Sequence, residues 1–379
     1  MKFALCLFNY FPYGGLQRDF IKIAEECLYR QHTVQVFTSE WRGEKIANLP
    51  VTLVPASGWT NHGRLNTFIQ KLATLLNEEK FDAIVGFNKI PGLDIYYAAD
   101  TCYAARMATR HFLTRWSPRY RSYSRNEAAV FSQNVSTQLL MISPTEQAHF
   151  IHHYQTATER FHLLPPSITV DRMLPVHTHT GMRMKLRKEW GLSEQHRVIL
   201  MVASRFKTKG LDRTLQAMAS LPAALLDKTI LLVVGDDKAA PFFSLIKRLK
   251  LQSRVKFLGA RNDVPSIMVA SDLLLNPAYV ENTGTVLIEA MANGLPVLAS
   301  GVCGYKDHVV KAKAGLIVPE PFDKNVFVKL LTSMISEESK SLLYPLWRDN
   351  AIRYCQHLDL FNGAKKAVNI IEDCTREKI

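Results

Sequence analysis

Several features are scarce or missing in this sequence of 379 residues, and each absence excludes a class of protein. Its six cysteines are scattered, with no C-x-x-C pair and no cluster with histidine at zinc-binding spacing, which fits a reducing compartment and excludes a disulfide scaffold. No run of about 18 apolar residues occurs, so no segment is expected to span a bilayer. The apolar start at 3–8 is too short for a signal peptide and predicts a first β-strand. We therefore expect a cytoplasmic protein that is soluble or peripheral on a membrane.

Two short motifs are also missing, and both concern ligands. The sequence has no G-x-G-x-x-G, the fingerprint of dinucleotide binding, which disfavours a nicotinamide oxidoreductase. It has no Asp-x-Asp, the usual carboxylate pair that holds a divalent ion on a diphosphate. We therefore expect no metal and no other cofactor, so that cationic side chains and helix N-termini balance the charge of any diphosphate.

Acidic residues are outnumbered, because 47 lysines and arginines against 34 aspartates and glutamates give a net charge of +13. Such a charge favours an anionic partner, namely a nucleotide, a phosphorylated substrate, a nucleic acid or an acidic membrane surface, without choosing among them. Hydrophobic residues make up 47% and charged residues 21%, which excludes a disordered chain. At about 100–200 residues per domain, the length favours two domains with a cleft between them.

Short apolar runs alternate with amphipathic stretches in both halves of the chain, as in a parallel sheet covered by helices. Strands at 2–8 and 33–38 flank a helical pattern at 16–30 and form a βαβ unit. We therefore predict an α/β protein with two doubly wound, Rossmann-like domains, connected near the Pro-Pro pair at 165–166. The predicted parts are an N-terminal acceptor-binding domain, 1–168, a C-terminal donor-binding domain, 169–345, and a helical tail, 346–379, that packs back toward the first domain.

Two loops carry residues suited to a phosphorylated ligand. Gly14 and Gly15 lie between the first strand and a helix, where glycines let backbone N–H groups approach a phosphate; the alternative is a tight turn that needs positive φ. After the strand at 198–203, Arg205 and Lys209 can together neutralise a diphosphate beyond the carboxyl end of the sheet. The alternative for these two cations is a solvated loop without a ligand.

A third loop gives the strongest signal, a Glu-x7-Glu spacing from Glu281 to Glu289. Asn282–Thr285 are predicted to be the cap and first turn of a helix whose N–H groups are free for an anion. At a rise of about 1.5 Å per residue, the two carboxylates lie roughly 12 Å apart, which matches the length of a nucleotide-sugar. One carboxylate can accept hydrogen bonds from a sugar and the other from a ribose. A glutamate at a helix start is also favoured by the dipole alone, and this spacing occurs by chance in many chains.

Together these residues resemble a known family. The Glu281-x7-Glu289 pair, the Arg205-x3-Lys209 loop and the Gly14-Gly15 turn look like a retaining glycosyltransferase of family 4, with the GT-B fold of two Rossmann-like domains facing across a cleft. Further segments resemble the lipopolysaccharide core glucosyltransferases within that family. These segments are YFPYGGLQRDF at 10–20, TNHGR at 60–64, GFNKIPGLD at 86–94, RFHLLPP at 160–166 and VCGY at 302–305.

The resemblance implies roles for individual residues. It places Glu289 on the ribose hydroxyls, Arg205 and Lys209 on the diphosphate, and Glu281 on the glucose hydroxyls. The implied catalytic residues are Asp100, Glu281, Lys209 and Arg205. The other implied donor-binding residues are Gly14, Gly15, Asp19, Arg172, Arg261, Asn282, Thr283, Gly284 and Thr285.

The resemblance also implies a mechanism, a same-face displacement with retention in which the leaving phosphate oxygen takes the proton of the acceptor. Asp100 is then expected to position or polarise the acceptor rather than to form a covalent intermediate. The sequence departs from the family pattern at Ser167, where glycine commonly follows the Pro-Pro pair. It departs again at Asn282–Thr285, where some relatives carry smaller residues.

A segment at 103–131 is basic and aromatic, with six arginines against one acid, Glu127. Such a segment suits the headgroup layer of an anionic bilayer, although single-stranded nucleic acid or a plain solvated face also fits its composition. Because the implied acceptor is lipid-linked and phosphorylated, we favour the membrane. The arginines are Arg106, Arg110, Arg115, Arg119, Arg121 and Arg125. The residues predicted to face the acceptor or the membrane are Lys89, His62, Arg64, Arg115, Trp116, Arg119 and Arg121. For Lys89, His62 and Arg64, the alternative is a structural role in their loops.

These observations lead to one expected function. The resemblance implies a metal-independent hexosyltransferase that moves glucose from UDP-glucose to a heptose of the lipopolysaccharide inner core, in α-1,3 linkage, on the cytoplasmic face of the inner membrane. Its expected partners are UDP-glucose, the heptose acceptor and the anionic membrane surface, and no nucleic acid. One alternative is the same fold with another nucleotide-sugar or another anionic glycan acceptor. The other is a non-catalytic nucleotide-sugar- or lipid-binding protein, against which the intact set of Glu281, Glu289, Arg205 and Lys209 argues.

Overall fold

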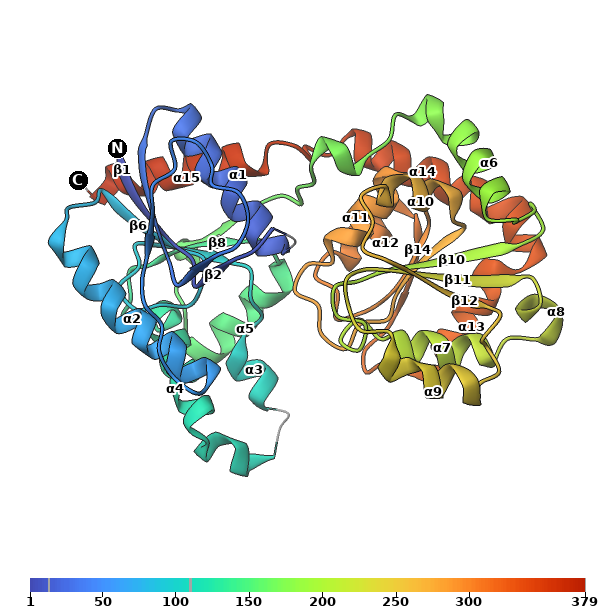
Figure 1. Cartoon of the computed structure of the whole chain (residues 1–379), viewed down its shortest axis with the longest axis horizontal. Helices are drawn as coiled ribbons and strands as arrows, with labels where there is room; N and C mark the ends of the chain where they lie inside the picture. Colours follow the sequence, from blue (N-terminus) through green and yellow to red (C-terminus); the bar gives the residue numbers. More distant parts are fainter. Residues whose placement is uncertain (13, 109–110, 379) are drawn as a thin grey trace. The chain divides into compact units, whose positions relative to one another are not determined.

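The computed structural model describes residues 1–12, 14–108 and 111–378 of the chain (Figure 1). Contacts divide the chain into two compact units: unit 1 consists of Met1–Pro165 with Asn362–Ile379, and unit 2 of Pro166–Phe361. Each unit is a parallel sheet with helices on both faces. The predicted α/β class with two Rossmann-like domains is therefore confirmed.

Unit 1 is built on a seven-stranded sheet. Its strands are β1 (Lys2–Cys6), β3 (Thr33–Thr38), β5 (Val51–Leu53), β6 (Ala83–Gly86), β7 (Ile95–Ala98), β8 (Gln138–Met141) and β9 (Phe161–Leu163). They lie in the order β5-β3-β1-β6-β7-β8-β9, and every pairing is parallel. A separate two-stranded sheet pairs β2 (Asn9–Tyr10) with β4 (Glu40–Trp41).

Helices cover both faces of this sheet. They are α1 (Gly15–Tyr29), α2 (Asn61–Glu78), α3 (Tyr103–Ala108), α4 (Pro118–Phe131), α5 (Pro144–Tyr154) and α15 (Gly363–Lys378), with short 3₁₀ helices η1 (Phe112–Trp116) and η2 (Thr158–Arg160). Successive side chains of a strand point to opposite faces. In β1, Phe3 and Leu5 therefore pack toward α1 and α15, and Ala4 and Cys6 pack toward α2, α4 and α5 (Figure 1).

Unit 2 is built on a six-stranded parallel sheet. Its first three strands are added toward one edge of the sheet, and its last three are added toward the other edge. Its strands are β10 (Arg197–Val202), β11 (Thr229–Val234), β12 (Val255–Gly259), β13 (Leu273–Asn276), β14 (Val297–Ser300) and β15 (Gly315–Val318). Their order is β12-β11-β10-β13-β14-β15. The chain grows from β10 to one edge and then returns to grow from β13 to the other. Ligands of doubly wound sheets bind beyond the carboxyl ends of the strands at such a reversal, here between β10 and β13.

The strands of unit 2 are nearly continuous apolar runs, such as RVILMV in β10, because helices bury both faces. One face packs against α7 (Leu211–Ala219), α9 (Ala240–Arg248) and α13 (Lys324–Ile335). The other packs against α10 (Val264–Ala270), α11 (Thr285–Ala292), α12 (Lys306–Ala312) and α14 (Tyr344–Gln356). The remaining elements are α6 (His179–Glu189), α8 (Ala223–Leu226), η3 (Val170–Arg172), η4 (Val176–Thr178) and a π-turn, η5 (Ser339–Leu343).

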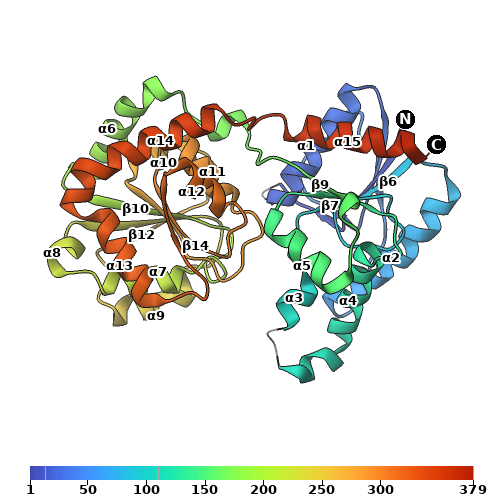
Figure 2. The same ribbon diagram turned by 180° about the vertical axis from the view of Figure 1, so that it is seen from behind.

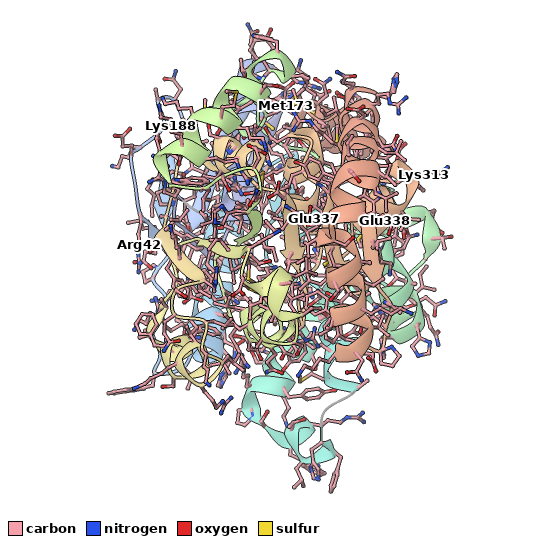
Figure 3. All side chains as sticks on the ribbon, turned by 90° about the vertical axis from the view of Figure 1, so that its right-hand side faces the viewer. Arg42, Met173, Lys188, Lys313, Glu337 and Glu338 are labelled. Carbon is pink, nitrogen blue, oxygen red and sulfur yellow. The ribbon has the colours of Figure 1, made fainter. Side chains whose placement is uncertain are left out.

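A buried arginine fixes the start of β10. The Arg197 guanidinium is 2% exposed, donates to the Ile335 carbonyl oxygen (3.0 Å) and pairs with Glu337 (2.7 Å), the residue labelled in Figure 3. Because Glu337 is solvated, this ion pair has a smaller desolvation cost than a fully buried pair. This contact ties β10 to the end of α13.

The predicted tail, 346–379, is corrected, because the structure divides it between the two units. α14 belongs to unit 2, where Ala351 and Cys355 join the core cluster with α11. α15 belongs to unit 1, where Ala367 and Ile371 pack beside α1 (Figure 2). The first unit ends at Pro165 rather than at 168. The apolar pattern of a helix shows that one face is buried, but not which sheet buries it.

Candidate functional site

Two loops of unit 2 meet at the carboxyl ends of the neighbouring strands β10 and β13. Gly210 has φ of +81°, and a Cβ there would lie 2.1 Å from the carbonyl oxygen of Pro277, so only glycine allows this approach. The N–H of Tyr279 donates to the carbonyl oxygen of Thr208 (2.9 Å), and the Lys209 ammonium forms an ion pair with Glu281. The loop after β10 and the loop after β13 therefore form one surface, which brings together residues that the sequence separates by 72 positions.

Lys209 and Arg205 offer donors to this surface in different ways. The Lys209 ammonium carries three donors, so it can keep its pair with Glu281 and still donate to a phosphate. The Arg205 side chain is exposed and forms no ion pair with a described carboxylate. Its planar guanidinium is therefore available to bind a phosphate with two parallel hydrogen bonds.

An arginine that the sequence analysis missed supports the second loop. The Arg213 guanidinium lies 3.7 Å from the ring centroids of both Tyr279 and Phe322. It donates to the carbonyl oxygens of Pro277 (3.1 Å) and Ala278 (2.9 Å). Cation–π contacts and charge-assisted hydrogen bonds of this kind hold a loop in one conformation. No local pattern in α7 distinguishes Arg213 from a solvated arginine, because all of its partners are distant in sequence.

The helix after this loop begins later than predicted. α11 starts at Thr285, with Gly284 (φ +83°) as its N-cap, so Asn282 and Thr283 lie before the helix instead of in its cap and first turn. The roughly 12 Å estimate between Glu281 and Glu289 assumed helical rise over the whole interval, and that assumption is wrong for its first half. The N–H of Leu287 donates to the carbonyl oxygen of Gly284 (2.8 Å), whereas the N–H groups of Thr285 and Val286 precede the first intrahelical bonds and carry the positive end of the helix dipole, beside Glu281.

Glu289 is buried on α11, with 6% of the residue exposed. Its Oε1 lies 3.9 Å from Nε of Arg172, which comes from η3, far away in sequence. The Asn293 side chain holds η3 in place, since it donates to the carbonyl oxygen of Arg172 (2.8 Å) and accepts from the N–H of Leu174 (3.0 Å). The structure therefore brings the predicted donor residues Arg172 and Glu289 together.

Arg261 lies apart from this group. It follows β12, the edge strand, and its guanidinium pairs with Asp263 through two hydrogen bonds of 2.8 and 2.7 Å. This local pair occupies the guanidinium of a residue that the resemblance implied to bind the donor. No contact among the described residues joins Arg261 to Arg205 or Lys209.

In unit 1, Gly14 and Gly15 lie at the N-terminus of α1 as predicted, but neither has positive φ. The alternative explanation, a turn that needs positive φ, is therefore wrong. A Cβ on Gly15 would meet nothing within 4 Å, so the backbone there faces open space. Farther along α1, Asp19 accepts a hydrogen bond from the hydroxyl of Tyr97 (2.9 Å). Burial raises the pKa of Asp19, although Lys22, Tyr97 and Arg18 act to lower it.

Asp100 lies at a cavity of unit 1, which we call the Asp100 pocket. Its volume is about 250 Å³, and it is lined by Lys89, Asp100, Arg106, Arg119, Asn126 and the rings of Tyr103 and Tyr123. The structure thus brings together three predicted residues, Lys89, Asp100 and Arg119. His62 and Arg64 do not line the pocket: Nε2 of His62 lies 3.3 Å from Oγ1 of Thr60, the α2 cap, and Arg64 donates to the Ala56 carbonyl oxygen (3.4 Å).

Glu127, noted in the sequence only as a lone acid, is fully buried and organises the wall of this pocket. It pairs with the Lys89 ammonium and accepts from the N–H groups of Tyr103 (2.7 Å) and Ala104 (2.9 Å). The Tyr154 hydroxyl also donates to it (2.8 Å). Burial acts to raise the pKa of Glu127, but Lys89 and the N–H donors outweigh burial and hold that pKa below its ordinary value.

The basic aromatic segment is only partly exposed. Phe112, Leu113 and Trp116, in and around η1, are 62%, 60% and 70% exposed. By contrast, the ring of Tyr103 packs 5.9 Å from that of Tyr120 and 5.5 Å from that of Tyr123. Arg115 and Arg121 are exposed, whereas Arg110 lies outside the described residues. The exposed aromatic and basic residues therefore gather around η1 and the start of α4.

Two features are absent from the described residues. No three His, Cys, Asp or Glu side chains in the described ranges are arranged to hold a metal ion. Among those same residues, no helix is long and apolar enough to cross a membrane. That the transfer reaction needs no metal ion stays a prediction, because only an activity measurement tests it.

Comparison with known proteins identifies the family. The model of the family "Glycosyl transferases group 1" matches residues 182–350, and that of "Glycosyltransferase Family 4" matches residues 13–172. The lipopolysaccharide glucosyltransferase WaaG of Escherichia coli K12 is 42% identical over 372 residues, 98% of each chain. A crystal structure of WaaG, described as involved in lipopolysaccharide biosynthesis, matches with a TM-score of 0.90 over 97% of this chain and 99% of that one. Anabaena HepE, solved in complex with UDP-glucose, shares the fold alone, with 20% identity and a TM-score of 0.73 over 98% and 100% of the two chains.

The two Rossmann-like units and these matches define a glycosyltransferase of the GT-B class. The chain belongs, within that class, to the lipopolysaccharide glucosyltransferase family that WaaG represents. The resemblance found in the sequence is thereby confirmed.

Replacing Glu127 with glutamine tests the wall of the Asp100 pocket. Because the variant leaves the Lys89 ammonium without its carboxylate, we expect a loss of about 3 kcal/mol in the free energy of unfolding at neutral pH. The folded-state pKa of Glu127 is lowered, so its contribution is present above the unfolded pKa of about 4.3 and disappears as the pH falls through the folded pKa. Urea unfolding from neutral pH downward measures this, with exposed Glu159→Gln as the control. A pH-independent difference between Glu127→Gln and the wild type would contradict the assignment.

Proposed function

We propose that the protein transfers glucose from UDP-glucose to a heptose of the lipopolysaccharide inner core. The observation that carries the proposal is the meeting of the Arg205–Lys209 loop with Glu281 and the N-terminus of α11, in a chain 42% identical to WaaG along its length. Cations beside free N–H groups suit the diphosphate of a nucleotide-sugar. The similarity to WaaG, a lipopolysaccharide glucosyltransferase, supports the acceptor class and the transferred sugar.

The donor roles follow from the chemistry of each group in unit 2. Glu289, a buried carboxylate, suits the paired hydroxyls of a ribose. Arg205 and Lys209 suit the diphosphate, whose charge grows as UDP leaves, and fixed cations that stabilise this growing charge accelerate the reaction. Glu281, held by Lys209, suits glucose hydroxyls. The proposed set needs no metal ion.

For the acceptor, we favour a same-face displacement that retains the α configuration. In this mechanism the leaving phosphate oxygen takes the proton of the attacking heptose hydroxyl as the new glycosidic bond forms. Asp100 is exposed at its pocket and can accept a hydrogen bond from the acceptor, which orients the attacking hydroxyl. Gly15 and Asp19 are proposed to approach the donor phosphate and sugar.

The central test is transfer from a panel of labelled UDP-sugars to lipopolysaccharide truncated at the heptose region, with and without EDTA. We expect incorporation of glucose alone, undiminished by EDTA, because cations and N–H groups supply the charge stabilisation. Incorporation of a sugar other than glucose would change the assigned donor but would leave the assignment as a glycosyltransferase intact. Saturable UDP binding without transfer of any sugar would favour the non-catalytic alternative, and loss of activity in EDTA would contradict the metal-free mechanism.

Asp100→Ala tests the role of Asp100. If Asp100 orients the attacking hydroxyl, kcat falls by about 100-fold or more, while KM for UDP-glucose changes little. Steady-state kinetics with both substrates varied separates the two effects. Full activity in Asp100→Ala would remove Asp100 from the mechanism.

We further propose that the protein binds the anionic inner-membrane surface as a peripheral protein. The exposed side chains around η1 carry this proposal, since Phe112, Leu113 and Trp116 can enter the headgroup layer while Arg115 and Arg121 contact anionic lipid. An enzyme acting on a lipid-linked acceptor also needs to approach a bilayer.

Vesicle co-sedimentation tests this surface. Each basic residue near an anionic surface contributes about 1 kcal/mol, so Arg115→Gln with Arg121→Gln is expected to weaken binding by about 30-fold at low salt. We expect Trp116→Ala to weaken binding as well. Trp59→Ala is the control, because Trp59 is an even more exposed tryptophan of unit 1 that lies outside the segment. Equal effects of the two tryptophan variants, or preference for oligonucleotides over vesicles, would contradict the proposal.

A further inference from the structure

The Asp100 pocket contains more charged, amide and aromatic side chains than are needed to position one hydroxyl. Three cations, Lys89, Arg106 and Arg119, line it against one carboxylate, Asp100. Lys89 already pairs with Glu127 and donates to the carbonyl oxygen of Thr101 (2.8 Å). Lys89 therefore serves mainly to hold the wall, and the two arginines give the pocket its positive character.

The two arginines are exposed but not randomly placed. The guanidinium carbon of Arg106 lies 5.2 Å from the ring centroid of Tyr103, and that of Arg119 lies 5.7 Å from the ring centroid of Tyr123. Within the described part of the chain, no carboxylate forms an ion pair with Arg119. In each pair, the aromatic ring and the guanidinium come from the same helix, α3 or α4. A guanidinium that an aromatic ring holds in place is preorganised to bind a phosphate or a carboxylate.

Asn126 provides an independent indication that the pocket binds a ligand. It is 1% exposed and lines the pocket, yet neither Nδ2 nor Oδ1 of its amide has a hydrogen-bond partner among the described residues. Buried amides are normally paired, because an unpaired one loses its hydration without compensation. An amide offers one acceptor and one donor group side by side, which suits the adjacent hydroxyls of a sugar.

We propose that the Asp100 pocket binds an anionic sugar of the acceptor glycan, one that carries a phosphate or a carboxylate. Arg119 and Arg106 bind the anionic group, Asn126 binds ring hydroxyls, and the rings of Tyr103 and Tyr123 pack against the sugar ring. This inference rests on the proposed function, because it assigns the acceptor side of the same reaction. It adds that the enzyme recognises a charged sugar and not only the hydroxyl that it glycosylates.

Kinetics on the full chain tests the pocket in catalysis. We expect Arg119→Gln and Asn126→Ala each to raise KM for truncated lipopolysaccharide about tenfold, with KM for UDP-glucose unchanged, since charge-assisted and buried hydrogen bonds to the acceptor are lost. Arg119→Lys keeps the charge and is expected to recover part of the loss. Arg376→Gln is the matched control, an exposed arginine of unit 1 on α15, outside the pocket.

Direct binding tests the pocket independently of transfer. The probes are mannose 6-phosphate, glucuronate and neutral mannose, followed by saturation-transfer NMR on the wild type, Arg119→Gln and Arg376→Gln, with UDP present to fill the donor site. Binding of the phosphate probe, the carboxylate probe or both, lost only in Arg119→Gln, supports the inference and identifies the anionic group. Equal binding of neutral mannose, equal binding by the two arginine variants, or binding of no probe overturns it.

The two measurements separate failure of the inference from failure of the proposed function. If the wild type transfers glucose but neither pocket variant changes KM for the acceptor, the inference is wrong and the function stands. If the wild type transfers no sugar to any acceptor, the function is wrong, and the probe experiment still decides whether the pocket binds an anionic sugar. Unchanged thermal unfolding of Asn126→Ala shows that any effect is not misfolding, and we expect this because the amide has no hydrogen-bond partner among the described residues.

Discussion

The proposed donor site depends on one close backbone approach, that of Gly210 to the carbonyl oxygen of Pro277. Parallel strands bring their carboxyl ends to the same edge of a sheet, and the reversal of strand order makes β10 and β13 neighbours. That arrangement alone leaves two separate loops. The missing Cβ at Gly210 lets them touch, so that Lys209 reaches Glu281 and both lie beside the N-terminus of α11.

Both units hold a lysine against a carboxylate of low exposure. Lys209 pairs with Glu281 in unit 2, and Lys89 pairs with the fully buried Glu127 in unit 1. A buried carboxylate fixes the position of an ammonium that has further donors to offer. The pairs differ in what surrounds them: α11 adds N–H donors for a diphosphate, whereas the Asp100 pocket adds arginines, tyrosines and an unpaired amide that suit a sugar. The same kind of ion pair thus supports two sites of different chemistry.

Supporting residues explain much of what the sequence analysis did not find. Arg213 reads as an ordinary helical arginine, yet it lies between two aromatic rings and holds two carbonyl oxygens of the donor loop. Glu127 reads as the exception in a basic segment, yet four groups converge on it. Asn126 carries no sequence signal at all. Each of these roles arises from partners that are distant in sequence.

The sequence by itself determined the two parallel sheets, the phosphate-suited loops after their first strands and the family, because periodicity, glycine placement and family motifs are local properties. It placed Glu281, Lys209 and Arg205 at the correct strand ends for the same reason. Tertiary structure alone decided where α11 begins, since the positive φ of Gly284 depends on its surroundings, and that α14 packs on unit 2 while α15 packs on unit 1. It also gathered Lys89, Arg119 and Asp100 into one pocket and left His62 and Arg64 outside it. Packing between distant segments made these choices, and a local pattern shows only that a face is buried, not what covers it.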